Sequence, residues 1–537
     1  MAEWSYLGTT IGNILTSAPT LLYLCGGVIL GYIIGVIPGL GATMGMALVL
    51  GVIFRLPQVE GLALLIGILV SSMSSGGITA SLANIPGTSA AAATVMDGYP
   101  MTKKGRGREA CGYAYVSSCI GSILAMILVF FIQPFIAAVA LKFGNWETFL
   151  FCLFGVMLCG SLVGGDPIRG WVSAFVGIFV SMCGAEAVQS VVRYNFGTTK
   201  LLGGVSSVVA ILALFGLGEV IYTLSRPTEI RVKAESGFPI VRIPVFLKNI
   251  PNIIRSLLAG LWVGFIPGIG ESAACWFSYD LARKQEKNGK DFGTGVPEGI
   301  IAAEVANNAS SVGALIPSLA LGIPGSGSTA VFIAALFLIG YRPGPTLMTD
   351  SPGVLCAITV LFILAALVMM VAGYFLSRFA IRFLTLEESL LMPLIAIFCA
   401  IGAFATTYTK FSLILLLVFG VLGYLMKVFG YPIPPMLLGL LVGNTMDTAL
   451  RRAMIQYSND PLAMVTRPFG VAIFVFLLIM LYFSVRTTKS TKSSSKGGIH
   501  LRGGRRKALS GAVRRRNPVK KIKRPGNHRF PGLFILI

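Results

Sequence analysis

Gly35-Val36-Ile37-Pro38-Gly39-Leu40-Gly41 returns later in the chain as Gly264-Phe265-Ile266-Pro267-Gly268-Ile269-Gly270, and this repetition decides the fold. A second motif, Ile85-Pro86-Gly87-Thr88, follows the first copy, and Ile323-Pro324-Gly325-Ser326 follows the second at a similar separation. Two motifs that occur twice in the same order indicate an internal repeat. All four motifs interrupt apolar sequence, so the repeat concerns helices in a membrane.

The composition agrees with a membrane protein. Hydrophobic residues make up 55% of the 537 positions and charged residues only 12%, whereas soluble domains carry about 25% charged residues. Apolar runs of roughly 20 residues, the length that crosses a bilayer, recur along the chain. We therefore predict an all-α polytopic membrane protein with about twelve membrane-embedded helical segments, some of them broken.

The basic loops predict that the two copies have opposite orientations. In the first copy Lys103–Arg108 follows the second motif, whereas in the second copy Arg283–Lys290 lies between the two motifs. Short loops rich in Lys and Arg lie on the cytoplasmic side. If both loops are cytoplasmic, the copies form an inverted repeat, the arrangement that builds many secondary transporters.

The same assignment predicts a shape for each motif. The Pro-Gly-x-Gly element begins and ends on one side, so we expect a helical hairpin with its tip inside the membrane. The Ile-Pro-Gly element crosses from one side to the other as a broken helix. Proline and glycine leave backbone groups unpaired at membrane depth, which is tolerated only where protein, water or bound ions satisfy them. Four such breaks predict a ligand cavity, and one domain moving past a scaffold, as in an elevator, is the hypothesis for alternating access.

The candidate site residues are the motif residues together with nearby hydroxyl, amide and carboxylate groups. Freed N–H groups at helix N-termini attract anions, and carbonyl and hydroxyl oxygens bind hard cations. For the substrate we predict Asn84, Pro86, Gly87, Thr88, Ser89, Pro324, Gly325, Ser326, Ser328 and Thr329. For a coupling cation, Na⁺ or H⁺, we predict Pro38, Gly39, Gly41, Thr43, Pro267, Gly268, Gly270, Glu271, Ser272, Asn307 and Asn308.

Purely structural roles are the alternative for many of these residues. Small residues such as Gly27, Gly31 and Gly35 permit close helix packing, and amides such as Asn307 and Asn308 form interhelical hydrogen bonds. Ionisable side chains inside membrane segments are functional candidates by default. The acidic ones near the motifs are Asp97, Glu271, Asp280, Glu298, Glu304 and Asp447.

Other classes of protein fit less well. An intramembrane enzyme using Ser326 is disfavoured, because the only histidines are His500 and His528 near the C-terminus. The nine cysteines are scattered singly through apolar sequence, without metal-ligand spacing. A channel is disfavoured because channels usually repeat a filter around an axis. We expect no enzymatic activity, no cofactor other than the coupling ion, and no nucleic-acid partner.

At its motifs the chain resembles the TctA family, the large membrane subunits of tripartite tricarboxylate transporters. The resemblance covers roughly Gly26 to Pro468. It rests on Ile37–Gly41, Asn84–Thr88, Asp97–Pro100, Glu304–Ala309, Ala320–Ser326, Arg342–Pro345, Phe419–Tyr424 and Thr466–Pro468. The resemblance implies binding-protein-dependent, cation-coupled uptake of tricarboxylates or related carboxylates across a bacterial inner membrane. It implies two protein partners, a periplasmic solute-binding protein and a small four-helix membrane subunit similar to TctB. The lipid bilayer surrounds the membrane subunits. A carboxylate transporter without a binding protein is the alternative.

The predicted organisation has four parts. Residues 1–225 form the first membrane repeat, 226–248 a basic cytoplasmic linker, and 249–487 the second repeat. Residues 488–537 form a basic tail, predicted to be disordered and cytoplasmic because no Asp or Glu follows Arg486. The tail departs from the family pattern and holds no predicted site.

Overall fold

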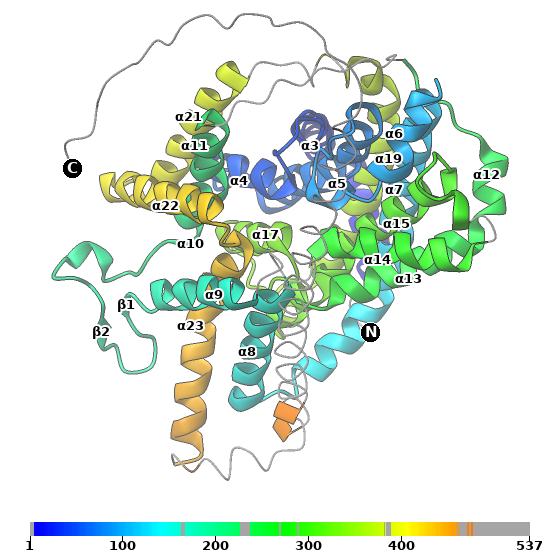
Figure 1. Ribbon diagram of the computed structural model, residues 1–537. Helices are drawn as coiled ribbons and strands as arrows, with labels where there is room; N and C mark the ends of the chain where they lie inside the picture. Colours follow the sequence, from blue (N-terminus) through cyan, green and yellow to red (C-terminus); the bar gives the residue numbers. More distant parts are fainter. Residues whose placement is uncertain are drawn as a thin grey trace, which may run out of the picture. The chain divides into compact units, whose positions relative to one another are not determined.

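A computed structural model describes most of the chain (Figure 1). The described residues are 5–162, 167–225, 237–267, 270–286, 289–380, 382, 388–458, 460, 470–471 and 474–475, and they belong to one compact unit, Met1–Met480. The predicted tail 488–537, residues 226–236 of the predicted linker, and Gly268 of the predicted cation site lie outside them. The four-part organisation stays a prediction.

The first half of the chain is helical apart from one small hairpin. Its helices are α2 (Leu7–Thr16), α3 (Ala18–Val36), α4 (Ala42–Ile53), α5 (Gln58–Ala83), η1 (Ser89–Ala91), α6 (Val95–Lys103), α7 (Gly107–Ala140), α8 (Asn145–Leu162) and α9 (Pro167–Ser181). Strands β1 (Gly184–Ala185) and β2 (Val192–Arg193) pair antiparallel, with Gly184 opposite Arg193. The half ends with η2 (Thr199–Leu201), α10 (Ser207–Ile211), the π-helix η3 (Leu212–Leu217) and α11 (Gly218–Ser225).

The second half contains only helices among its described residues. They are α12 (Ile243–Lys248), α13 (Ile250–Phe265), α14 (Gly270–Gln285), η4 (Gly289–Asp291), α15 (Pro297–Gly313), α16 (Leu315–Leu321) and α17 (Gly327–Leu338). After them come α18 (Leu347–Asp350), α19 (Val354–Leu376), η5 (Ser377–Phe379), α21 (Glu388–Thr407), α22 (Lys410–Phe429) and α23 (Ile433–Gln456). The all-α class is confirmed.

Seven helical stretches in the described part of the chain are long and apolar enough to cross a membrane. They are Ala18–Val36, Gln58–Ala83, Gly107–Ala140, Ser207–Ser225, Pro297–Leu321, Val354–Phe379 and Lys410–Phe429. Shorter apolar helices include α4, α13 and α17. The protein is therefore a multi-pass membrane protein, and the number of about twelve embedded segments stays a prediction.

Glycine contacts fix the helix before each Pro-Gly-x-Gly motif against the central helix of its copy. A Cβ atom at Gly35 of α3 would lie 2.2 Å from the carbonyl oxygen of Ser72 in α5. A Cβ atom at Gly264 of α13 would lie 2.2 Å from the carbonyl oxygen of Ser310 in α15. Only glycine permits backbones to approach so closely. The packing role that the sequence offered for Gly35 is therefore present in the structure.

The second motif also has the same backbone geometry in both copies. α5 ends at Asn84 and α16 ends at Gly322, each with left-handed backbone angles, φ 61° and 70°. A Cβ atom at Gly87 would lie 2.8 Å from Cα of Gly76, and one at Gly325 would lie 2.7 Å from Cα of Ala314. The predicted helix interruptions are thus present, and the two copies repeat each other in local structure. Their opposite orientation in a membrane and an elevator motion stay predictions.

Two further groups of helices lie beside the paired copies (Figure 1). α8, α9 and α23 pack on one another around Cys152, Ile178 and Leu438. α10, α11, α21, α22 and η3 form the other group. α17 contacts α4, α10 and α23, so the helix that follows the second Ile-Pro-Gly break lies where the first copy meets both groups.

Candidate functional site

Two adjoining cavities lie where the motifs of both copies come together. The first has a volume of about 520 Å³ and the second about 490 Å³. They share five lining residues, Thr43, Ser89, Phe215, Glu271 and Pro434. Each cavity is large enough for a small organic ligand. The helix ends that the Pro-Gly motifs create therefore surround one continuous region.

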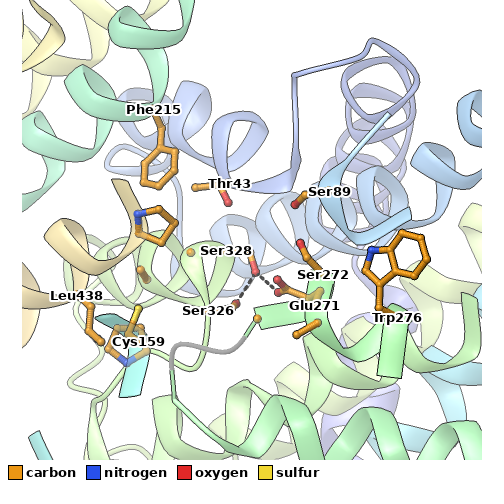
Figure 2. Close-up of a pocket in the computed structure, with 16 residues that line it drawn as sticks. Thr43, Ser89, Cys159, Phe215, Glu271, Ser272, Trp276, Ser326, Ser328 and Leu438 are labelled. Carbon is orange, nitrogen blue, oxygen red and sulfur yellow. Dashed lines mark hydrogen bonds between the residues drawn. The ribbon is translucent and has the colours of Figure 1, made fainter. Parts of the chain in front are cut away.

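Hydroxyl and carboxylate groups concentrate in the first cavity, as Figure 2 shows. Ser328 of α17 donates a 2.6 Å hydrogen bond to Oε1 of Glu271 in the first turn of α14. The Ser328 and Ser326 hydroxyls lie 2.8 Å apart. Thr43 and Ser272, which occupy matching positions in the two copies, face the same space.

The first cavity contains one acidic side chain, Glu271, among its described lining residues. Glu271 is 9% exposed, and no Lys or Arg is among the residues that line the first cavity. A buried carboxylate without a cationic partner is costly unless a cation or a proton compensates it. Carboxylate and hydroxyl oxygens are ligands that hard cations prefer. The first cavity therefore suits a cation. The described residues contain no cluster of three or more His, Cys, Asp or Glu side chains that could together bind a metal ion.

Ser326 begins the helix that lines this cavity. Its hydroxyl accepts a hydrogen bond from the backbone N–H of Thr329, and the Thr329 hydroxyl accepts one from the N–H of Ser326. This reciprocal pair is a capping box, which satisfies two helix N-terminal donors. A Cβ atom at Gly327 would lie 3.5 Å from Oγ1 of Thr43, so the start of α17 also contacts the first copy.

The second cavity lies against the first-copy motifs and contains the region's cationic side chain. Glu219 of α11 and Lys427 of α22 line it together with Gly39 and Gly87. Lys427 donates to Oε2 of Glu219, forming a partly buried ion pair. Glu219 follows the π-helix η3, whose Phe215 lines both cavities. Single π-helical turns are frequent at functional sites.

The structure brings together about two thirds of the predicted site residues. Those that line one or both cavities are Gly39, Gly41, Thr43, Pro86, Gly87, Thr88, Ser89, Gly270, Glu271, Ser272, Pro324, Ser326 and Ser328. Those described but not lining either cavity are Pro38, Asn84, Pro267, Asn307, Asn308, Gly325 and Thr329. Several of the second group shape the backbone instead, as the left-handed Asn84 and the closely packed Gly325 do.

Asn307 and Asn308 belong to a separate buried cluster around Glu304. The Glu304 carboxylate accepts hydrogen bonds from Thr94 (2.6 Å), Ser118 (2.9 Å) and Asn307 (3.2 Å). Asn308 accepts hydrogen bonds from serine hydroxyls of α5 and α7. These bonds join α15 to its neighbours, which is the interhelical role that the sequence left open for both amides.

Other acidic candidates hold loops and helices. Asp97 accepts three backbone N–H groups of the segment that precedes α15. Asp447 of α23 pairs with Arg193 of β2 and with Arg451. Asp280 is exposed and pairs with Lys284 on its own helix. None of these carboxylates lines either cavity.

Phe215, Glu219 and Lys427 are among the residues of the cavity wall that sequence reasoning missed. Glu219 and Lys427 are single charges within long apolar stretches, and such charges are functional candidates. Glu219 lies far from the motifs in sequence, so its position along the chain does not connect it with them. No local pattern marks Phe215.

Helix breaks that surround a polar, charged cavity in a multi-pass helical protein define a membrane transport protein. The particular family follows from comparison. The chain belongs to the Tripartite tricarboxylate transporter TctA family, whose pattern it matches over residues 21–438. The family's description places its members in transporters with further subunits, which agrees with interpreting the chain as a transporter component and not an enzyme.

Two relatives from Agrobacterium vitis are similar over much of their length. One, an "Uncharacterized 52.8 kDa protein in TAR-I ttuC' 3'region", is 31% identical over 448 residues, which cover 83% of this chain and 89% of the relative. The other, an "Uncharacterized protein in TAR-II ttuC' 3'region", is 32% identical over 234 residues, covering 43% of this chain and 97% of the relative. No solved structure matches the chain.

Proposed function

We propose that this protein is the large permease subunit of a binding-protein-dependent secondary transporter, and that it takes up tricarboxylates or related small carboxylates by alternating access, driven by a cation. Na⁺ is the preferred coupling ion and H⁺ the alternative. The single observation that carries the proposal is the convergence of Pro-Gly helix breaks from both copies on one pair of cavities. Membership of the TctA family supports the choice of substrate class.

The first cavity supports the cation part of the proposal. Glu271 supplies a buried carboxylate, and Thr43, Ser272 and Ser328 supply hydroxyl oxygens around it. Na⁺ is a hard cation, and oxygen ligands of this kind suit it. With H⁺ as the coupling ion, the same carboxylate would be the group that gains and loses the proton.

The family supports the assembly and the location. We propose a periplasmic solute-binding protein and a small membrane subunit as partners, in a bacterial inner membrane with the C-terminal tail on the cytoplasmic side. The basic loop Lys103–Arg108 and the basic residues after Arg486 support that side under the positive-inside rule.

The test is uptake of labelled carboxylates into proteoliposomes that contain this chain and its small membrane partner. The panel contains tricarboxylates, dicarboxylates and aromatic acids, with and without the binding protein, under an imposed Na⁺ or H⁺ gradient. Uptake that requires both the binding protein and one cation gradient is the expected result. Uptake without the binding protein would instead favour a two-component carboxylate transporter, and no gradient-driven uptake by folded protein would overturn the proposal.

Ser326 provides a test against the enzymatic alternative. In the structure its hydroxyl caps α17, so Ser326→Ala removes a helix cap, worth about 1 kcal/mol. We expect this variant to keep Na⁺-dependent uptake, which would exclude Ser326 as an essential nucleophile.

A further inference from the structure

Lys427 is the only basic side chain among the described residues that line the two cavities. Two carboxylates, Glu219 and Glu271, line the same region, so the lining side chains carry a net charge of −1 when all three are ionised. An anionic substrate entering this region meets repulsion unless Lys427 becomes available to it or cations enter as well. The state of the Lys427–Glu219 pair therefore decides how the cavity receives an anion.

The ion pair joins two helices beside the first Pro-Gly-x-Gly turn. Lys427 lies in the last turn of α22, and Glu219 lies in the first turn of α11. The Lys427 ammonium lies 5.0 Å from the ring centroid of Tyr222, a cation–π distance. Oε2 of Glu219 accepts from Lys427, while Oε1 faces Gly39, lying 3.7 Å from the position a Cβ atom there would take.

A residue that lines the second cavity also has a hydroxyl group without a hydrogen-bond partner among the described residues. This residue is Thr88, on the first-copy Ile-Pro-Gly break, which is 7% exposed as a residue and has a fully buried hydroxyl. Buried polar groups are normally hydrogen-bonded, and an exception at a cavity wall indicates a place where a ligand or water supplies the partner. Thr88 and Lys427 thus line the same cavity, one as a neutral donor and one as a charge.

Breaking a partly buried ion pair leaves two charges uncompensated, so it opens readily only when new partners replace both. A substrate carboxylate can replace Glu219 at the ammonium, and a cation can replace Lys427 at the carboxylate. Neither ligand alone compensates both charges. Such an exchange makes the binding of one ligand depend on the other, which is a coupling free energy between two sites.

We propose that the Lys427–Glu219 pair is the charge-exchange element of this transporter: Lys427 binds a carboxylate group of the substrate, and the released Glu219 binds a coupling cation. This inference rests on the proposed function and adds to it the substrate-binding residue and a second cation position beside the one at Glu271. It also assigns α11 and α22, which carry no Pro-Gly motif, to the binding site.

The test compares single and double variants in the reconstituted three-component system, with labelled citrate and ²²Na⁺ as probes. Lys427→Gln is expected to raise the half-saturating citrate concentration at least tenfold. Glu219→Gln is expected to leave citrate uptake that depends far less on the Na⁺ gradient, with fewer Na⁺ moved per citrate. Lys410→Gln, at the exposed opposite end of α22, is the matched control and is expected to behave like the wild type.

The double variant Lys427→Gln/Glu219→Gln separates exchange from a structural role. If the pair only holds α11 to α22, removing both charges restores wild-type citrate and Na⁺ dependence, and that result would overturn the inference. If the pair exchanges ligands, the double variant stays impaired in citrate affinity and in coupling, even with a wild-type melting temperature. Absence of gradient-driven uptake in the wild type would overturn the proposed function and this inference with it, whereas an active wild type with unaltered variants overturns this inference alone.

Discussion

Replacing Asp97 is expected to loosen the start of α15, because this one carboxylate holds the segment before it. Oδ1 of Asp97 accepts the N–H groups of Gly293 (2.9 Å), Gly295 (2.8 Å) and Val296 (3.0 Å). Oδ2 accepts the hydroxyl of Tyr279 in α14 at 2.8 Å. Asp97 is fully buried, so water does not replace it. A residue of the first copy thereby anchors two helices of the second.

The magnitude follows from the hydrogen bonds that each substitution removes. Asp97→Ala leaves three N–H groups and the Tyr279 hydroxyl without an acceptor, and each buried unsatisfied group costs about 1–3 kcal/mol, so we expect a loss of roughly 4–6 kcal/mol after partial relaxation. Asp97→Asn keeps an oxygen for the N–H groups but loses the charge and replaces the acceptor of the Tyr279 hydroxyl by an amide NH₂ group, so a loss of about 2–3 kcal/mol is expected. Tyr279→Phe removes a single bond and should cost about 1–2 kcal/mol.

The assay is the free energy of unfolding of purified protein in mixed micelles, measured by SDS titration. Asp280→Asn is the matched control, because Asp280 lies on α14 beside Tyr279 but is exposed and forms only an i,i+4 pair with Lys284. Such surface pairs contribute little, so the control should stay within about 0.5 kcal/mol of the wild type. An Asp97→Ala variant as stable as the Asp280→Asn control would refute the reasoning.

Three further predictions concern packing, coupling and pH. Gly27→Ala should destabilise by about 2–3 kcal/mol, because its Cβ would lie 2.4 Å from a backbone oxygen of α5, whereas Gly26→Ala, with no atom within 4 Å, should be neutral or slightly stabilising in the same SDS titration. Glu271→Gln keeps an acceptor for Ser328 but loses the charge, so the half-saturating Na⁺ concentration for uptake should rise at least tenfold; an unchanged value would remove Glu271 from the cation site. Backbone N–H groups in the loop after α9 hold the pKa of Glu186 below its ordinary value, so its contribution to stability is present at neutral pH and lost as the pH falls through the lowered pKa. The protection of that loop's amides, taken relative to the intrinsic exchange rate at each pH, should therefore fall only in acid, and Glu186→Gln should remove this dependence.

Local sequence was sufficient to predict the helix breaks. Proline and glycine act through the backbone of their own segment, so Pro38, Pro86 and Pro324 mark interruptions whatever the surrounding fold. Their gathering around one cavity region was also predictable, because unpaired backbone groups at membrane depth need a polar surrounding. The hydroxyl residues next to the motifs, such as Ser328, could be proposed for the same reason.

Partners distant in sequence could not be predicted. Glu219 and Lys427 lie 208 residues apart, and neither residue's neighbours indicate the other. The surroundings of Asn307 could not be predicted either. An amide in an apolar helix has the same local sequence pattern whether it faces a cavity or a neighbouring helix. The hydrogen bond from Asn307 to Glu304 lies within α15, but its hydrogen bond to the carbonyl of Ala90 exists only once α15 has packed against η1 of the first copy.

The two copies share backbone geometry at the Ile-Pro-Gly breaks but differ in the side chains at matching positions. Glu271 of the second copy corresponds to Ala42 of the first, and Ser328 corresponds to Ala90, so the carboxylate and the hydroxyl that binds it occur in one copy only. The basic charge, Lys427, lines the cavity at the first-copy motifs. The duplicated Ile-Pro-Gly breaks thus supply similar backbone groups from both copies, while the charged side chains around them are not duplicated. Moving the carboxylate across the copies, with Ala42→Glu and Glu271→Ala together, is therefore expected not to restore coupling, because Ala90, which has no hydroxyl, occupies the position in the first copy that Ser328 occupies in the second.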